Sequence, residues 1–148
     1  MFSQIDKDLI PKGALPYFQS NPNVLVIEDD RFMTEVFLGT LGDIGFQVTI
    51  STNGTVALNR LQQQAIDFII LDLLLPDMNG FDLFRQLKKN CKTANIPVIM
   101  VTAWGDTTHR KKAAELGIKH FLTKPFTEDE LLEEIFNLLV DHKARRYA

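Results

Sequence analysis

Short runs of apolar residues alternate with longer segments of helical periodicity along most of the chain. Apolar residues are continuous at residues 24–27 and 68–71, as expected of strands that are buried on both faces. The runs predict five strands, at residues 24–27, 46–51, 68–71, 97–101 and 121–123. Apolar residues at helical spacing follow each run and predict five helices, ending near residues 44, 64, 89, 116 and 140. The last helix begins with Thr127-Glu-Asp-Glu130, which matches a capping box.

This alternation predicts an α/β domain with right-handed crossovers and a parallel sheet covered by helices on both faces. The 148 residues are enough for one domain with a substantial core. Residues 1–22 contain three prolines and are expected to form an N-terminal extension, with a short helix near residues 4–10. The domain itself is expected to span residues 23–141, and residues 142–148 to form a C-terminal tail.

Acidic residues follow two of the predicted strands. Glu28, Asp29 and Asp30 follow the first strand, and Asp72 follows the third. Ligand sites of parallel α/β sheets lie beyond the carboxyl ends of the strands, so these carboxylates are expected to meet there. Asp30 also precedes a helix directly and suits the role of its N-cap. Clustered carboxylates repel one another unless a cation offsets their charge, and Mg²⁺ prefers carboxylate and water oxygens.

Two further polar residues lie at the ends of the fourth and fifth strands, at the same edge of the sheet. Thr102 ends the fourth strand, and Lys124 follows the fifth. A hydroxyl donor and an ammonium, together with a carboxylate nucleophile and a metal, are the groups that phosphoryl transfer requires. The pattern therefore predicts a phosphoryl-transfer site.

Four motifs resemble the signature of the two-component response regulator receiver domain, the CheY-like family. They are Val24-Leu-Val-Ile-Glu-Asp-Asp30, Leu71-Asp-Leu-Leu-Leu-Pro-Asp-Met-Asn-Gly80, Val101-Thr-Ala103 and Thr123-Lys-Pro-Phe126. Their order matches the family, and so do the intervals of 43, 30 and 22 residues between Asp29, Asp72, Thr102 and Lys124. The resemblance covers about residues 23–141. It implies a flavodoxin-like, doubly wound sheet of five parallel strands in the order 2-1-3-4-5 with five helices.

The resemblance also assigns the metal and phosphoryl sites. Asp72 would accept the phosphoryl group, in the manner of a switch rather than an enzyme with a separate substrate. Glu28, Asp29 and Asp72, with the backbone carbonyl of Leu74, would hold Mg²⁺ or Mn²⁺. Thr102 and Lys124 would bind phosphoryl oxygens.

Four other positions take roles from the same resemblance. Ala103 would leave room for the phosphoryl group, and the bond before Pro125 would be cis. Phe121 matches an aromatic switch position that acts together with Thr102. Leu74 and Trp104 would flank the path of a hydrolytic water, where an aliphatic side chain and an indole offer no acceptor for its proton.

The expected phosphodonor is a sensor histidine kinase or a His phosphotransfer protein. An effector or a second copy could bind through the fourth helix, fifth strand and fifth helix. The last helix carries a wide apolar stripe, which either serves such a surface or is covered by the N-terminal extension. Phe32 is a candidate for a kinase docking surface.

Three other functions are less consistent with the residues. An aspartyl phosphohydrolase would need an acid two residues after the nucleophile, where this chain has Leu74. A flavin-binding module would need a Gly- or Ser/Thr-rich phosphate loop after the first strand, where this chain has acids. A receiver that is never phosphorylated would usually lack a key residue, and none is missing.

Composition and charge bear on the expected partners and on the cellular compartment. The net charge of −3 gives no electrostatic reason to expect nucleic acid, and no apolar run is long enough to span a membrane. The single Cys91 and the lack of a signal peptide predict a cytoplasmic protein. His109, His120 and His142 lack metal-ligand spacing and are expected on the solvent side. The basic residues near the C-terminus, Lys143, Arg145 and Arg146, are expected to be a solvated helix end. No effector segment is visible after residue 141.

Overall fold

The computed structural model describes residues 21–147, with side chains described up to His142. The expected short helix near residues 4–10 and the side chains of Lys143, Arg145 and Arg146 lie outside these residues.

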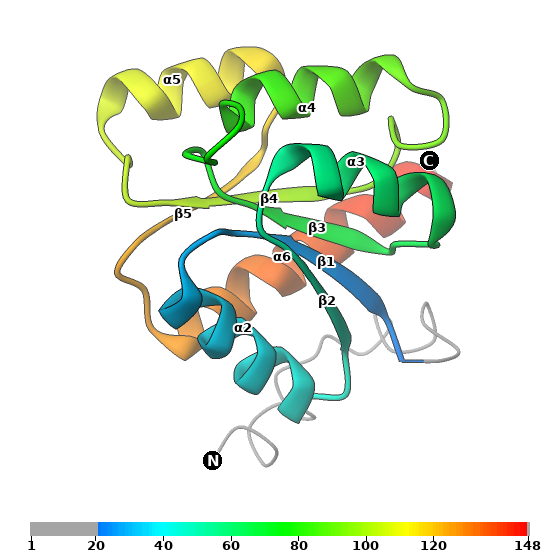
Figure 1. Ribbon diagram of the computed structural model, residues 1–148, viewed down its shortest axis with the longest axis vertical. Helices are drawn as coiled ribbons and strands as arrows, with labels where there is room; N and C mark the ends of the chain where they lie inside the picture. Colours follow the sequence, from blue (N-terminus) through cyan, green and yellow to red (C-terminus); the bar gives the residue numbers. More distant parts are fainter. Residues whose placement is uncertain (1–20, 148) are drawn as a thin grey trace.

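The five strands form one parallel sheet (Figure 1). They are β1 (Asn23–Ile27), β2 (Gln47–Ser51), β3 (Phe68–Leu71), β4 (Val98–Thr102) and β5 (His120–Thr123). Their order across the sheet is β2-β1-β3-β4-β5, with every neighbouring pair parallel. The flavodoxin-like strand order is therefore confirmed, and each strand lies within one or two residues of its predicted place.

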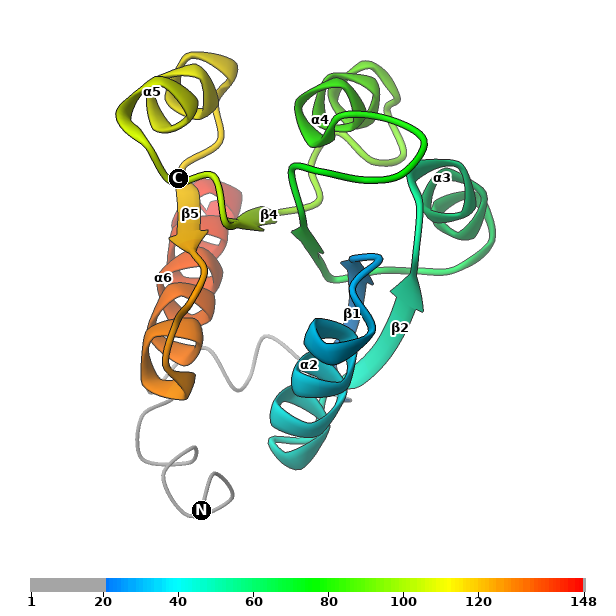
Figure 2. The ribbon, with the colours of Figure 1, turned by 60° about the vertical axis from the view of Figure 1, so that its left-hand side comes forward.

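Five helices cover the two faces of the sheet (Figure 2). They are α2 (Arg31–Asp43), α3 (Gly54–Gln63), α4 (Gly80–Lys89), α5 (Thr107–Leu116) and α6 (Glu128–Tyr147). Helices α2 and α6 pack on one face, and α3, α4 and α5 pack on the other. Val24 and Val26 of β1 belong to the first core, whereas Leu25 and Ile27 belong to the second. Since successive side chains of a strand point to opposite faces, a continuous apolar run supplies both cores.

Local helix signals act as the sequence predicts. Asp30 caps α2 by accepting a hydrogen bond from the amide of Phe32 at 3.1 Å. At the start of α6, the Thr127 hydroxyl accepts from the amide of Glu130 at 3.1 Å, and the Glu130 carboxylate accepts from the amide of Thr127 at 3.3 Å. The capping box is therefore confirmed.

Helix α6 is longer than expected. It continues to Tyr147, seven residues beyond the predicted end at residue 140, so the expected tail at 142–148 is mostly helical. No glycine or proline follows Val140 to end the helix. Of the apolar residues in its stripe, Val140 is largely exposed. The others are buried, namely Leu131, Leu132, Ile135, Phe136, Leu138 and Leu139.

One side chain lies elsewhere than expected. His120 was expected on the solvent side, but it is only 8% exposed. Because β5 begins at His120, one residue earlier than predicted, its side chain enters the packing between β5 and α6.

Candidate functional site

The acidic residues after β1 and β3 meet at the carboxyl edge of the sheet. Two backbone hydrogen bonds extend the sheet by one residue on either side of β1: the Asp72 amide donates to Ile27 at 3.0 Å, and the Glu28 amide donates to Ser51 at 3.0 Å. The backbone positions of both acids are thereby fixed. Carboxylate oxygens of Glu28, Asp29 and Asp72 lie within 4.8 Å of one another.

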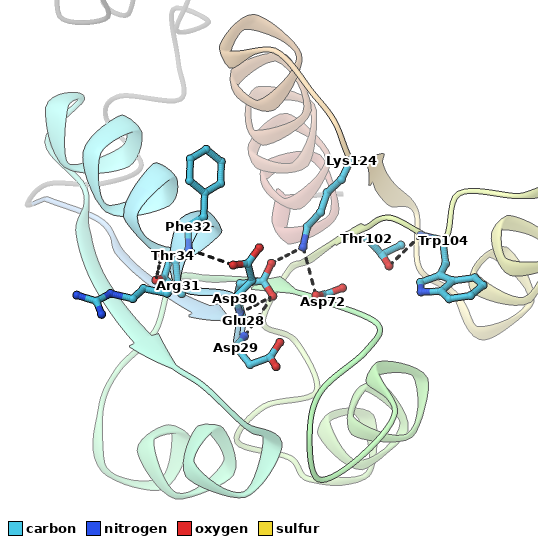
Figure 3. A network of polar contacts seen from close by, with 10 residues as sticks. All are labelled: Glu28, Asp29, Asp30, Arg31, Phe32, Thr34, Asp72, Thr102, Trp104 and Lys124. Atoms are coloured by element: carbon cyan, nitrogen blue, oxygen red, sulfur yellow. Dashed lines mark hydrogen bonds and ion pairs between the residues drawn. The ribbon is translucent and has the colours of Figure 1, made fainter.

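Lys124 reaches this acidic cluster from the far edge of the sheet (Figure 3). Its Nζ forms an ion pair with Glu28 and lies 3.2 Å from Oδ2 of Asp72. The Lys124 amide donates to the carbonyl of Thr102 at 2.8 Å, which fixes the start of the loop after β5. The Lys124–Pro125 bond is cis, as expected.

The electrostatics of the cluster indicate an excess of negative charge. The pKa of Glu28 is raised to about 7, chiefly by burial and then by the hydrogen bond with Asp72, whereas Lys124 acts to lower it. For Lys124, burial acts to lower the pKa, but the contacts with Glu28 and Asp72 outweigh it, so the pKa is raised overall. One ammonium thus faces three carboxylates. A divalent cation at this position would offset the remaining charge.

Thr102 lies at the end of β4, the strand next to β3, and the indole of Trp104 points away from the acidic cluster (Figure 3). Thr102 is fully buried at the end of β4, and its Oγ1 accepts a hydrogen bond from the Trp104 amide at 3.2 Å. Ala103, between them, is exposed. The Trp104 side chain is 48% exposed, and Leu74, in the loop after β3, is 49% exposed. Both large apolar side chains are therefore about half exposed to solvent, and their place beside the path of a hydrolytic water stays a prediction.

The β3–α4 loop is held in place by contacts that the motif alone does not reveal. A Cβ on Gly80 would lie 2.5 Å from the carbonyl oxygen of Asp72, so only glycine fits there. Asp77 accepts hydrogen bonds from the amides of Gly54 and Thr55, at 2.8 and 2.9 Å, and from the Thr55 hydroxyl at 2.7 Å. The sequence shows Asp77 only as part of a turn, because its partners are 22 and 23 positions away.

Arg110 is a second residue that sequence analysis missed. Its guanidinium lies 4.8 Å from the centre of the Phe121 ring and donates to the carbonyl of Gly105 and the hydroxyl of Thr123. Cation–π contacts of this kind stabilise the position of an aromatic ring. Phe121, half-buried on β5, is therefore held by α5 as well as by its own strand.

The three histidines, which were expected on the solvent side, differ in their surroundings. His109 and His142 are half-buried, and His109 pairs with Asp106 and stacks on Phe81. His120 contacts two carboxylates of α6: Nδ1 lies 3.1 Å from Glu134 and Nε2 lies 2.9 Å from Asp141. Among residues 21–142, the only group of acids and histidines with metal-ligand spacing is Glu28, Asp29 and Asp72.

A parallel five-stranded sheet with an acidic cluster and a lysine at its carboxyl edge defines a phosphoryl-accepting regulatory domain. The family model described as response regulator receiver domain matches residues 24–136. The chain therefore belongs to the response regulator receiver domain family.

Curated relatives support the same assignment. The chain is 40% identical over 116 residues to the probable transcriptional regulator ycf29 of Pyropia yezoensis, which covers 78% of this chain and 52% of that protein. It is 37% identical over 116 residues to the transcriptional regulatory protein CusR of Escherichia coli K12, covering 78% and 50%. The chain thus spans about half the length of the curated relatives it matches.

Solved structures agree in fold. A CheY-like receiver domain protein from Methanospirillum hungatei matches with a TM-score of 0.77 and 23% identity, covering 85% of this chain and 99% of that one. The receiver domain of a sensor histidine kinase from Pseudomonas aeruginosa, solved with a magnesium ion in its active-site cleft, matches with a TM-score of 0.74 and 25% identity, covering 82% and 99%. None of the helices in the described part of this chain is long and apolar enough to cross a membrane.

Proposed function

We propose that this receiver domain is switched on when Asp72 accepts a phosphoryl group in the presence of Mg²⁺. The observation that carries the proposal is the placement of Asp72 within one cluster of two further carboxylates and the Lys124 ammonium. Asp72 is largely buried but keeps about a tenth of its side-chain surface exposed, through which a phosphodonor would approach.

The donor would be a phosphohistidine of a sensor histidine kinase or a His phosphotransfer protein. A carboxylate oxygen of Asp72 attacks phosphorus, the new O–P bond forms, and the N–P bond to the imidazole breaks. The imidazole nitrogen keeps the electron pair and takes a proton from solvent. The product is an aspartyl phosphate.

The acidic cluster fits a divalent cation. Glu28, Asp29 and Asp72 would hold Mg²⁺ together with the backbone carbonyl of Leu74, and water would complete the octahedral shell. The bound ion would offset the charge of the carboxylates and of the incoming phosphoryl group. The magnesium ion in the Pseudomonas aeruginosa receiver domain supports this choice over Mn²⁺.

Thr102 and Lys124 would bind the phosphoryl oxygens. Lys124 already lies 3.2 Å from Asp72, so its ammonium is placed to pair with a group on that carboxylate. The hydroxyl of Thr102 would donate to a second oxygen, and the small side chain of Ala103 would leave room for the group. A shift of Thr102 would be transmitted to Phe121, whose ring would change position by packing alone because it has no hydroxyl.

The signal would leave through the surface of α5, β5 and α6, by contact with an effector or a second copy. The curated relatives are transcriptional regulators, which supports an output domain or partner that acts on transcription. A direct nucleic-acid contact by this domain is not expected from its net charge of −3. We place the protein in the cytoplasm, where an exposed single cysteine remains reduced.

The test is phosphorylation with acetyl phosphate and Mg²⁺, followed by intact-mass spectrometry. We expect one phosphoryl group on the wild type and none on Asp72→Asn, because an amide is a poor nucleophile. Asp43→Asn removes an exposed carboxylate of α2 and should be labelled like the wild type. Full labelling of Asp72→Asn would refute the assignment.

A further inference from the structure

A cavity of about 660 Å³ lies at the end of the sheet opposite the acidic cluster. It is lined by the last part of α4, the segments that lead into β3, β4 and β5, and the last described turn of α6. The acidic cluster follows the carboxyl ends of the strands, whereas this cavity lies at their amino ends. The cavity is therefore separate from the proposed phosphorylation site, and its volume is in the range of small-molecule sites.

The cavity has an apolar part contributed by three different elements. Phe84 comes from α4, Ile118 precedes β5, and Leu138 comes from α6. Each of these side chains is at most 5% exposed, so they are held firmly by the core. They form the fixed floor of the cavity, and Ile96 and Pro97, which are partly exposed, offer the apolar surface that a ligand can reach.

The rim of the cavity carries two lysines whose ammonium groups have no partner within the described residues. Lys92 and Lys119 line the cavity and are exposed, and neither forms an ion pair or a hydrogen bond through its ammonium with residues 21–142. The two acids of the cavity are already engaged. Asp67 accepts from the amide of Asn23 at 2.7 Å, and Asp141 contacts His120 at 2.9 Å.

The surrounding segment is strongly basic within an acidic protein. Residues 80–119 contain eight Lys and Arg against three Asp and Glu, a formal charge of +5, although the whole chain has a net charge of −3. Charge separated in this way produces a positive potential on one side of the molecule and attracts anions to it.

Helix ends do not account for the two rim lysines. Lysines in the last turn of a helix offset the partial negative charge of its carbonyl groups. Lys88 and Lys89 do this for α4, where Lys88 also donates to the carbonyl of Ala94 at 2.8 Å. Lys92 and Lys119 lie beyond the ends of α4 and α5, in the loops that follow.

We propose that this cavity binds a small organic anion. The apolar body of the ligand packs against Ile96 and Pro97, above the floor formed by Phe84, Ile118 and Leu138, and its carboxylate, sulfonate or phosphate pairs with Lys92 and Lys119. Such a ligand contacts the loop after α4 and the segments before β4 and β5 together. Its binding is independent of phosphoryl transfer at Asp72.

The probe for this site is naphthalene-2-sulfonate, an aromatic anion that cannot donate a phosphoryl group. Titration into the ¹⁵N-labelled full chain should give saturable shifts of the amides of Ala94, Ile96, Ile118 and Lys119. The neutral analogue 2-naphthalenemethanol should bind at least tenfold more weakly, because it cannot pair with the lysines.

Charge-reversal variants distinguish binding in this cavity from non-specific attraction of the anion to the basic segment. Lys92→Glu with Lys119→Glu should weaken binding of naphthalene-2-sulfonate by roughly tenfold or more. Lys89→Glu with Lys111→Glu makes the same change of charge on the same basic segment, outside the cavity, and should leave the affinity within about twofold. Equal weakening in both double variants, shifts confined to the residues near Asp72, or the absence of saturable binding would each overturn the proposal.

Discussion

Lys124 and Glu28 form an ion pair across the sheet, although 96 positions separate them in the sequence. Glu28 is almost fully buried, and its only cationic partner among the described residues is this ammonium. The pair joins the loop after β5 to the end of β1, so it links the two sides of the site. It also leaves Asp29 available to a metal.

Replacing Lys124 with methionine should destabilise the protein when no divalent cation is present. The buried Glu28 would then lie beside Asp72 with no opposing charge, and the free energy of unfolding at pH 7 should fall by about 2 kcal/mol. Adding Mg²⁺ should reduce this loss, since the cation would offset the same charge. Urea denaturation with EDTA and with Mg²⁺ measures both effects, and an unchanged free energy in EDTA would contradict the role given to the pair.

Asp29→Asn should weaken Mg²⁺ binding by roughly tenfold, because one of three carboxylate ligands is lost. Mg²⁺ should raise the Tm of the wild type, since a ligand that binds only the folded state stabilises it. The shift should be smaller in Asp29→Asn and unchanged in the control Asp43→Asn. Equal Mg²⁺ affinities of wild type and Asp29→Asn, measured by titration calorimetry, would rule out the proposed metal site.

Leu74 and Trp104 should prolong the phosphorylated state. An in-line water must approach phosphorus from the side opposite Asp72, and both half-exposed side chains would exclude it there without accepting its proton. Leu74→Asn combined with Trp104→Glu should speed hydrolysis by roughly tenfold or more, equivalent to about 1.4 kcal/mol in the barrier. The decay of the phosphorylated species is followed by mass spectrometry, and an unchanged half-life would place the control of hydrolysis at other residues.

Asp77→Ala should lower the Tm at neutral pH by removing the acceptor of three hydrogen bonds at the start of α3. The hydrogen bond from the Gly54 amide, followed by that from the Thr55 hydroxyl, lowers the pKa of Asp77 below 3.8. The folded state therefore binds its proton more weakly than the unfolded state. The stabilisation is complete above pH 3.8 and is lost as the pH falls through the lower value of the folded protein.

The difference in the free energy of unfolding between wild type and Asp77→Ala should thus be constant from pH 5 to 7. It should become smaller below about pH 4. Urea denaturation at a series of pH values measures it. A difference that grows on acidification would show that the carboxylate is not the stabilising form.

His120→Leu should destabilise the packing of α6 on β5. The buried imidazole is the partner of Glu134 and Asp141, and its removal leaves the half-buried Glu134 without a hydrogen-bond donor. We expect a loss of about 1–2 kcal/mol in the free energy of unfolding. A double-mutant cycle with Glu134→Gln should show that the two losses are not additive, and strict additivity would mean that the contact contributes nothing.

The sequence by itself determined the architecture and the chemical identity of the site. Continuous apolar runs mark strands buried on both faces, and a parallel sheet brings their carboxyl ends to one edge. Glu28, Asp29, Asp72, Thr102 and Lys124 each follow or end such a run, so their meeting could be predicted without coordinates. The capping box at Thr127 could also be predicted, because both partners lie within one turn.

Only the tertiary structure decided the contacts between distant elements. The pairing of Asp77 with the start of α3, the position of Arg110 over Phe121, and the burial of His120 depend on how helices and loops pack on the sheet. The extension of β5 to His120 places this side chain on the same face as Leu122, toward α6, and the length of α6 decides whether Asp141 reaches it. Such contacts arise from the register and packing of whole elements, so no local pattern of residues encodes them.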